Sequence, residues 1–396
     1  MYDGLRTLAY VAAAWLIAYA LARAAGLDKR LAWLRIGPGY LVLRSRRLNR
    51  LMSDVVARHR RAAATFCVVS AASGVAMIAA AFAMLAMNLV VYFTATPGGP
   101  PPAQLLLPGV TISFDTFARM LPGIVLILFS HEMSHKIALD AVGIRVRSVG
   151  VFLALLIPGA FVEPDEEEFG RSGPGPRMKV LAAGSLANIM LALALMPLVT
   201  SPGLFLAAIS PLYSPPAGVV VSRIIPGTPM HNQSFIEAGD VILEVKGVRV
   251  RCIDDLLGIR LSPGEEVRVT YIDVDTGSVR SIVLRAAADP ENASRGILGY
   301  IPENYYPPKL PWLPPTLPDA IYESLYWASF LSLNVALINM LPIFPLDGYG
   351  FADALLESAG LRGRVRRAVL YALMALSLAL LATNLAANLI WRLVAG

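Results

Sequence analysis

Three residues in one short segment have the types and spacing of a catalytic metal site. His131 and His135 are four residues apart, with Glu132 directly after the first histidine. On a helix, residues four apart share one face, so the two imidazoles can bind a single metal ion. Glu132 is then placed to act as a general base on a water molecule at that ion. Alternatively the histidines make only interhelical hydrogen bonds, but a carboxylate between them in an apolar segment is costly and usually functional.

A catalytic zinc ion commonly has three protein ligands and one open position, so this helix lacks one ligand. The other two histidines, His59 and His231, fall in polar regions of the chain. We therefore expect a carboxylate to complete the set, and Asp347 is the candidate. Pro342 and Pro345 precede it and cannot continue regular helix bonding, so the backbone should open there. The alternative is a plain Pro-Gly helix end that leaves Asp347 in the headgroup region.

The composition places these residues in a polytopic α-helical membrane protein. Of the 396 residues, 56% are hydrophobic and only 16% are charged, and the mean hydropathy is +0.60. A spanning helix needs about 20 mostly apolar residues. Six segments meet that length: Leu8–Leu27, Ala64–Thr96, Phe117–Val142, Val180–Pro197 with an optional extension to Ile209, Ala320–Leu346 and Ala368–Ala395.

The distribution of basic residues sets the orientation of these helices. The connection after the first span is rich in arginine, whereas Pro97–Thr116 contains no Lys or Arg. Positive residues favour the cytoplasmic side, so we expect the first connection there and both termini outside. The same pattern accounts for the net charge of +6 without a nucleic-acid partner. The third and fifth spans then run in the same direction, and His135 and Asp347 can meet near their cytoplasmic ends.

A polar stretch divides the apolar chain and predicts a separate domain. Proline-rich edges frame it, and its short β-rich runs with turn signals are typical of a compact β domain. The orientation count places this domain on the extracytoplasmic side. The expected organisation is 1–63 with the first span and a basic cytoplasmic connection, 64–214 with the metal helix and fourth span, 215–318 with the β domain and a Pro-rich linker, and 319–396 with Asp347 and the last span.

Together these residues resemble the site-2 protease family of intramembrane metalloproteases. That family has a zinc-binding HExxH helix and a later N-x-x-P-x-x-P-L-D-G segment, which this chain matches at Asn339, Pro342, Pro345, Leu346, Asp347 and Gly348. The resemblance implies that His131, His135 and Asp347 hold one Zn²⁺ ion. It also implies that Glu132 is the general base of an intramembrane zinc endopeptidase, which hydrolyses peptide bonds in or near transmembrane segments in regulated intramembrane proteolysis.

The resemblance suggests roles for the surrounding segments as well. A small-residue helix with an Asn lies between the two family motifs, and Gly184–Asn188 fits it loosely, so Asn188 is a candidate for substrate contact or for shaping the site. Asn339 is a candidate for oxyanion stabilisation. The run Val149–Val162 is too short to span. By resemblance it is a re-entrant hairpin that lines the route to the zinc and pairs with an extended substrate strand, whereas its residues alone fit an interfacial segment equally well.

The polar domain, from about Gly218 to Arg285, is similar to a PDZ domain, a fold that binds extended segments by strand addition. The family resemblance implies that the partners are single-span membrane proteins, in some cases already trimmed by another protease, together with membrane lipids. Its implied location is the cell membrane. In such a protease, the PDZ-like domain would act outside the cytoplasm.

Two other functions fit parts of the sequence. A membrane metalloprotease with a cytosolic catalytic domain also carries HExxH, but its motif leads into a large cytoplasmic region, whereas the large polar region here is expected on the opposite side. A membrane scaffold or receptor would instead act through its PDZ-like domain and keep a vestigial metal site. The complete set of ligand and base residues argues against a scaffold.

Overall fold

The computed structural model describes residues 2–27, 31, 33–94, 105–155, 157–233, 235–290 and 292–395, with the backbone alone at 2–8 and 388–395. The chain forms two compact units. Met1–Met196 with Ser324–Gly396 is called the membrane unit, and Pro197–Glu323 is called the β unit. The end of the predicted second span, Ala95 and Thr96, lies outside the described residues.

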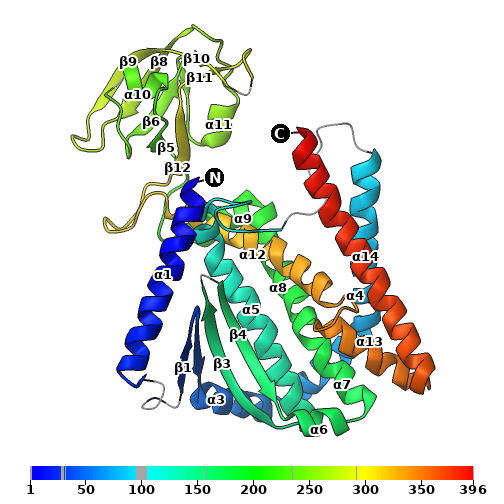
Figure 1. Ribbon diagram of the computed structural model, residues 1–396. Helices are drawn as coiled ribbons and strands as arrows, with labels where there is room; N and C mark the ends of the chain where they lie inside the picture. Colours follow the sequence, from blue (N-terminus) through cyan, green and yellow to red (C-terminus); the bar gives the residue numbers. More distant parts are fainter. Residues whose placement is uncertain are drawn as a thin grey trace. The chain divides into compact units, whose positions relative to one another are not determined.

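Among the described residues, five helices are long and apolar enough to cross a membrane, and Figure 1 shows their arrangement within the membrane unit. They are α4 Arg60–Thr94, α5 Phe114–Val142, α7 and α8 taken together as Pro174–Thr200, α12 Leu317–Asn339 and α14 Gly363–Ala395. The multi-pass helical fold is thereby confirmed. The first predicted span forms helix α1, Tyr2–Ala24, of which the structure describes the side chains from Ala9 onward, and this described part is an apolar helix of fewer than 18 residues. A span at Leu8–Leu27 therefore stays a prediction.

Two of the predicted spans have different limits in the structure. The fourth is divided into α7, Pro174–Leu181, and α8, Ala183–Thr200, and its optional extension is a separate helix α9, Pro202–Ile209. The fifth, predicted to reach Leu346, ends at Asn339, and a new helix α13, Asp347–Ser358, begins after a connection that contains both prolines. Proline cannot donate the backbone hydrogen bond that would continue a helix, which explains the early end.

The apolar run Val149–Val162 forms a β-hairpin that belongs to a four-stranded sheet. The hairpin is β3 Val146–Ala154 and β4 Ile157–Pro164, with Leu156 outside the described residues. β3 also pairs with β2, Tyr40–Arg44, which pairs with β1, Leu34–Gly37. The order β1-β2-β3-β4 makes β4 an edge strand. The hairpin agrees with the form that the family resemblance implies, and its position relative to the membrane stays a prediction. The sheet strands in the first connection are additional to the predicted elements.

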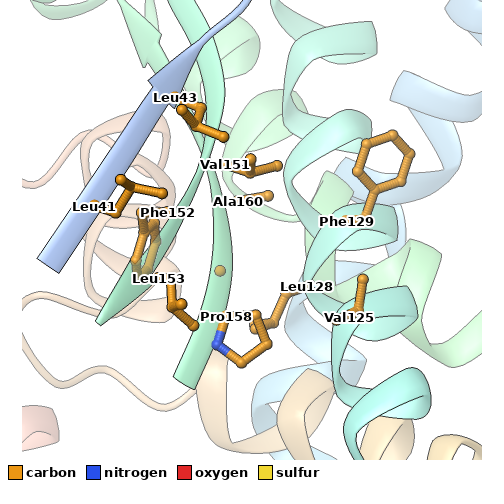
Figure 2. A pocket seen from close by; sticks show the side chains of 11 residues that line it. Leu41, Leu43, Val125, Leu128, Phe129, Val151, Phe152, Leu153, Pro158 and Ala160 are labelled. Atoms are coloured by element: carbon orange, nitrogen blue, oxygen red, sulfur yellow. The ribbon is translucent and has the colours of Figure 1, made fainter. Parts of the chain in front are cut away.

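The two faces of this membrane sheet differ because successive side chains of a strand point to opposite sides. Leu41 pairs with Leu153, and Leu43 pairs with Val151, so these side chains share one face. We call it the inner face because it lies against α5, and the opposite side is the outer face. An apolar cavity of about 260 Å³ separates the inner face from α5 (Figure 2). It is lined by Leu41, Leu43, Val151, Phe152, Leu153, Pro158, Gly159 and Ala160 of the sheet and by Val125, Leu128 and Phe129 of α5.

The β unit contains the predicted inserted β domain. Its sheet has the order β12-β5-β6-β8-β9, with β7 beside β6. The strands are β5 Gly218–Ile224, β6 Val241–Val245, β7 Val248–Arg249, β8 Glu266–Ile272, β9 Val279–Arg285 and β12 Tyr300–Tyr305, with a separate pair β10 Ala287–Ala288 and β11 Gly296–Ile297. Two short helices, α10 Pro229–Gln233 and α11 Ile253–Leu257, complete it.

The predicted end of this domain at Arg285 is wrong. β12 pairs antiparallel with β5 along its whole length, so the sheet is complete only at Tyr305. A bulge between Ile301 and Pro302 interrupts the register, which accommodates a proline that cannot donate to the ladder. Because Pro302 lies in β12 and Pro307 and Pro308 follow it closely, the sequence of this strand resembles a linker.

Close contacts between helices bring the two halves of the metal-site sequence together. A Cβ atom at Gly123 of α5 would lie 3.0 Å from the Cβ of Ala328 on α12, so the glycine lets these helices approach closely. On the next turn of α12, Ser332 Oγ donates to the carbonyl oxygen of Asn188 on α8 at 2.8 Å. α12 therefore packs on both α5 and α8, and its end lies beside the histidine turns of α5.

A buried ion pair stabilises the end of α5. Lys136 is 1% exposed, and its ammonium donates to the Asp140 carboxylate and, at 2.8 Å, to Ser53 Oγ of α3, Arg46–Arg58. Ser53 Oγ in turn donates to Asp140 Oδ2 at 3.0 Å. Such a charge is tolerated inside a protein only when it is paired and hydrogen-bonded. The cluster therefore ties α3 to the metal helix.

Replacing Asp140 by Ala leaves the Lys136 ammonium buried without its carboxylate. We expect the free energy of unfolding in detergent to fall by about 3 to 5 kcal/mol, the usual cost of breaking a buried pair from one side. The control Asp54→Ala removes an exposed acid from α3 and should change stability by less than about 0.5 kcal/mol. Equal losses in the two variants, measured by thermal or denaturant unfolding, would contradict a stabilising pair.

Candidate metal centre

The two histidines of α5 lie on successive turns of one helix face. Their Nε2 atoms are 3.1 Å apart, and their side chains are only 9% and 12% exposed. α5 continues for two more turns beyond His131 and His135 and ends at Gly143, whose φ of 79° is the left-handed conformation typical of a helix C-terminus. The rigid helix therefore holds both rings at a constant separation.

Asp347 reaches the histidines as the first residue of α13. Its Oδ2 atom is 3.3 Å from His131 Nε2 and 3.1 Å from His135 Nε2. The next residue, Gly348, is buried, and a Cβ atom there would lie 2.1 Å from the carbonyl oxygen of Met340. Only a residue without Cβ lets the first turn of α13 lie so close to the end of α12.

The three ligand atoms have the arrangement that a single metal ion requires. His135 Nδ1 is 2.9 Å from the carbonyl oxygen of Val180, which only accepts, so Nδ1 carries a proton, and in the neutral imidazole Nε2 carries a lone pair. That lone pair faces the Asp347 carboxylate, another acceptor, and this arrangement calls for a cation. An ion with four ligands at about 2.0 Å places them about 3.3 Å apart, and the observed separations are 3.1 to 3.3 Å. The group therefore fits one tetrahedral divalent ion.

Two asparagines support the ligands. Asn188 of α8 is fully buried, and its amide is 3.2 Å from His131 Nδ1. In the orientation drawn, Asn188 Oδ1 has no hydrogen-bond partner among the described residues. Turning the amide over lets Oδ1 accept a proton from Nδ1, which leaves Nε2 free to bind a metal. On the other side, Asn339 Nδ2 donates to Asp347 Oδ2 at 2.6 Å.

The side chain of Glu132 on the metal helix α5 points toward β4, the edge strand of the membrane sheet. Its Oε2 atom accepts a hydrogen bond from the backbone N–H of Val162 at 3.2 Å. Val162 belongs to β4, so the free edge of the sheet is beside the carboxylate. A chain that pairs with this edge would pass close to Glu132.

Gly184 is a site residue that the sequence indicated only as part of the small-residue segment Gly184–Asn188. A Cβ atom at this position would lie 2.5 Å from His131 Cε1 and 2.6 Å from the Nε2 atoms of both histidines. The glycine therefore leaves room for the rings against α8. In the sequence only the small-residue motif around Gly184 pointed to this position. Such motifs are common wherever helices pack, so the motif did not identify Gly184 as a site residue.

Ion pairs fix α13, and with it Asp347, against the neighbouring helices. The guanidinium of Arg177 on α7 pairs with Glu357 near the end of α13. Arg366 of α14 lies 2.7 Å from Glu357 and 3.2 Å from Asp353. Arg177, with Arg366 beside it, holds the pKa of Glu357 below its usual range.

The structure thus brings together all four residues expected to do the chemistry. Asn188 and Asn339 contact them, while Pro342, which is buried, and Pro345, which is exposed, lie in the connection before Asp347. The ligand and base roles themselves stay predictions.

Known proteins resemble this chain over much of its length. Residues 120–381 match peptidase family M50. An uncharacterized protein of Methanocaldococcus jannaschii is 26% identical over 255 residues, which are 63% of this chain and 60% of that protein. A membrane-bound transcription factor site-2 protease homolog of Arabidopsis thaliana is 25% identical over 144 residues, which are 36% of this chain and 27% of that protein. The chain therefore covers less than two thirds of either relative.

Solved structures of PDZ domains resemble a smaller part of the chain. The PDZ domain of the SdrC-like protein of Listeria monocytogenes is 18% identical, with a TM-score of 0.19, over 22% of this chain and 87% of that domain. Its counterpart from Listeria innocua has the same identity and TM-score over 22% of this chain and 92% of that domain.

Changing Gly184 to Ala should disturb the metal centre directly. The added methyl group would displace the histidine rings, and we expect the affinity for a divalent ion to fall by about 10-fold to 100-fold, as when a ligand loses its supporting contacts. Metal titration of the purified protein measures this. The control Gly175→Ala places a methyl group where nothing lies within 4 Å, and it should leave the affinity unchanged. Equal affinities in the two variants would refute the proposed packing role of Gly184.

Proposed function

Because this chain belongs to peptidase family M50, we propose that it is an intramembrane zinc endopeptidase with His131, His135 and Asp347 as ligands. One observation carries this proposal: two imidazole nitrogens and a carboxylate oxygen lie within 4.8 Å of one another in a multi-pass membrane protein, with Glu132 next to the first of them in sequence. Two histidines and one carboxylate form a typical ligand set for catalytic zinc, which leaves a position open for water or substrate.

The chemistry divides between the ion and the chain's own residues. A zinc ion in this position would polarise the scissile carbonyl and lower the pKa of the attacking water. Glu132 would remove a proton from that water as the oxygen attacks the carbonyl carbon. The same carboxyl group would then give the proton to the leaving amine nitrogen as the carbon–nitrogen bond breaks.

The supporting residues would keep the ligands in the productive form. Asn188 and the carbonyl of Val180 each contact the Nδ1 atom of one histidine, which leaves both Nε2 atoms for the metal. This position behind His131 favours a site-shaping role for Asn188 over direct substrate contact. Asn339 would hold Asp347 through the carboxylate oxygen that faces the histidines, and its amide is also near enough to the site to assist at a developing oxyanion.

We infer that the substrate enters as an extended strand. Carbonyl groups of a transmembrane helix are hidden in internal hydrogen bonds, so the helix must unwind locally before it can be cut. The free edge of β4 offers backbone partners for the unwound segment, because an edge strand presents unpaired N–H and C=O groups. The apolar cavity between the inner face and α5 lies one or two turns of α5 before His131 and would accept an apolar side chain of that strand.

The proposed substrates are single-span membrane proteins, including anchored regulators already trimmed by another protease. The β domain would act on the extracytoplasmic side as a filter that excludes large ectodomains, and the metal centre would lie near the cytoplasmic side. The arginine-rich first connection and the basic residues after the metal helix support this orientation. The competing scaffold function would not require the metal centre.

Replacing Glu132 by Gln should abolish cleavage while metal is retained. We expect the cleavage rate of a membrane substrate to fall by about 100-fold to 10,000-fold, the usual contribution of a general base, with bound zinc unchanged by elemental analysis. Chelation should remove the zinc and also stop cleavage. The control Glu166→Gln changes an exposed acid of α6, Glu166–Arg171, and should cleave normally. A scaffold would keep its function in both variants, and that result would refute the protease.

Helix-weakening residues near the cut should control the rate. Replacing Gly, Pro or polar residues of a cleaved substrate helix by Leu stabilises the helix, by about 1 kcal/mol for each Gly and about 3 kcal/mol for each Pro. We expect cleavage to slow by about fivefold or more for each such change. The same changes placed at the far end of the substrate helix serve as the control. Rates that do not depend on these residues would contradict local unwinding.

A further inference from the structure

The outer face of the membrane sheet has a floor of aromatic rings. A Cβ atom at Gly37 would lie 2.1 Å from the Tyr40 ring, and one at Gly159 would lie 2.2 Å from the Phe152 ring. At Gly150 the Phe161 ring would be 2.7 Å away. Each ring therefore lies over the glycine opposite it on the neighbouring strand, where any other residue would displace it. The result is a level apolar surface rather than a set of projecting side chains.

Two guanidinium groups border this floor. Arg35 pairs with Val42, and Phe152 pairs with Val42 from the other side, so Arg35 shares the outer face with the rings. Arg44 follows two residues after Val42 on the same face. Rings and charges together line a hollow of about 430 Å³ formed by Arg35, Tyr40, Arg44, Phe152, Phe161 and Glu163.

The charges of the hollow are not balanced. Glu163 is the acid among the lining residues, and its Oε2 atom already accepts from Ser148 Oγ at 2.6 Å. Arg44 lies 3.9 Å from the same oxygen, and both side chains are nearly half exposed. No salt bridge joins Arg35 to another residue in the described part of the chain. Two guanidinium groups against one carboxylate leave a net positive charge that favours an anion.

The sheet is apolar at the tip of the β3–β4 hairpin and charged at its other end, which matches the apolar chains and the charged headgroup of a lipid. The tip of the β3–β4 hairpin is apolar, with Leu155 50% exposed and Ile157 53% exposed. The opposite end carries Arg44 and Glu163, directly before the arginine-rich helix α3. In a multi-pass membrane protein, this gradient runs from the hydrocarbon region to the headgroups. The rings extend along this gradient, because Tyr40 is level with the hairpin tip, Phe152 lies midway and Phe161 is level with Arg44.

We propose that the outer face binds one anionic phospholipid, with its phosphate on Arg35 and Arg44 and an acyl chain over the aromatic floor. Guanidinium groups bind phosphate oxygens through charge-assisted hydrogen bonds. The flat rings supply the apolar contact that a free phosphate would not use. A phospholipid is favoured over a peptide because the hollow combines positive charge at the headgroup end with an apolar floor toward the hydrocarbon region. The proposal does not depend on proteolysis.

The bound lipid would also steady the edge of the sheet. Phe161 and Glu163 line the hollow, and the backbone N–H of Val162 between them donates to the Glu132 carboxylate. A lipid on the outer face would therefore limit the movement of the strand that contacts the metal helix. The lipid would then be a specifically bound structural partner of the sheet and not only a part of the surrounding bilayer.

Native mass spectrometry of the full chain can test this site. The protein is equilibrated with equal amounts of phosphatidylglycerol and phosphatidylcholine of the same acyl chains, and the retained lipid is identified. We expect one retained phosphatidylglycerol, and about tenfold less retention in the double variant Arg35→Gln and Arg44→Gln, since each basic residue adds appreciably to anionic lipid binding. The control Arg47→Gln and Arg50→Gln removes the same charge from α3 and should retain the lipid.

Other outcomes would overturn the site. Equal retention in the two double variants would show either no site or only general surface charge, and preference for phosphatidylcholine would exclude an anionic ligand. Displacement of the lipid by soluble glycerol phosphate would identify a free phosphate site instead. Thermal unfolding shows whether both variants are folded. The variant Phe152→Ala, which keeps both charges, should also weaken lipid retention, and unchanged retention there would reject the aromatic floor.

Discussion

The structure depends on placing three electron-pair donors around one point inside a membrane protein. His135 shows the constraint most clearly, because its Nδ1 atom is committed to the carbonyl of Val180 and its Nε2 lone pair faces the Asp347 carboxylate. Without a metal ion or a proton between them these acceptors would repel one another. The arrangement can persist only where helix packing holds the ligands in position. The rest of the membrane unit can be understood as the means of doing so.

One continuous helix and one break between two helices position these donor groups. α5 is continuous and sets the separation of the two imidazoles. Asp347 comes from a point where α12 has ended and α13 begins, and the buried Gly348 brings these two helices into close contact. Irregular backbone at membrane depth is tolerated only where protein or a water-filled cavity covers it. The neighbouring helices α4 and α14 provide that cover. Ile343 and Leu346 of the connection pack in one apolar cluster with Leu85 of α4 and Leu380 of α14.

The membrane sheet serves the site in a different way. Its alternating side chains produce an apolar inner face toward α5 and an outer face of rings and arginines. Because β4 pairs on one side only, the sheet brings a free edge to Glu132. The proposed substrate pairing, the side-chain cavity and the proposed lipid site would thus use separate parts of four short strands.

The sequence by itself determined the local features of this protein. The spacing of His131 and His135, the prolines before Asp347 and the long apolar runs depend only on neighbouring residues. The structure shows the predicted helix, the predicted break and, among the described residues, five of the six predicted spans. Only the tertiary structure decided which distant segments meet. The pairing of β2 with β3, the completion of the β domain by β12 and the contact of Gly184 with both histidines join residues far apart in the chain. Such contacts arise from packing and strand pairing across space, which no local pattern of residues records.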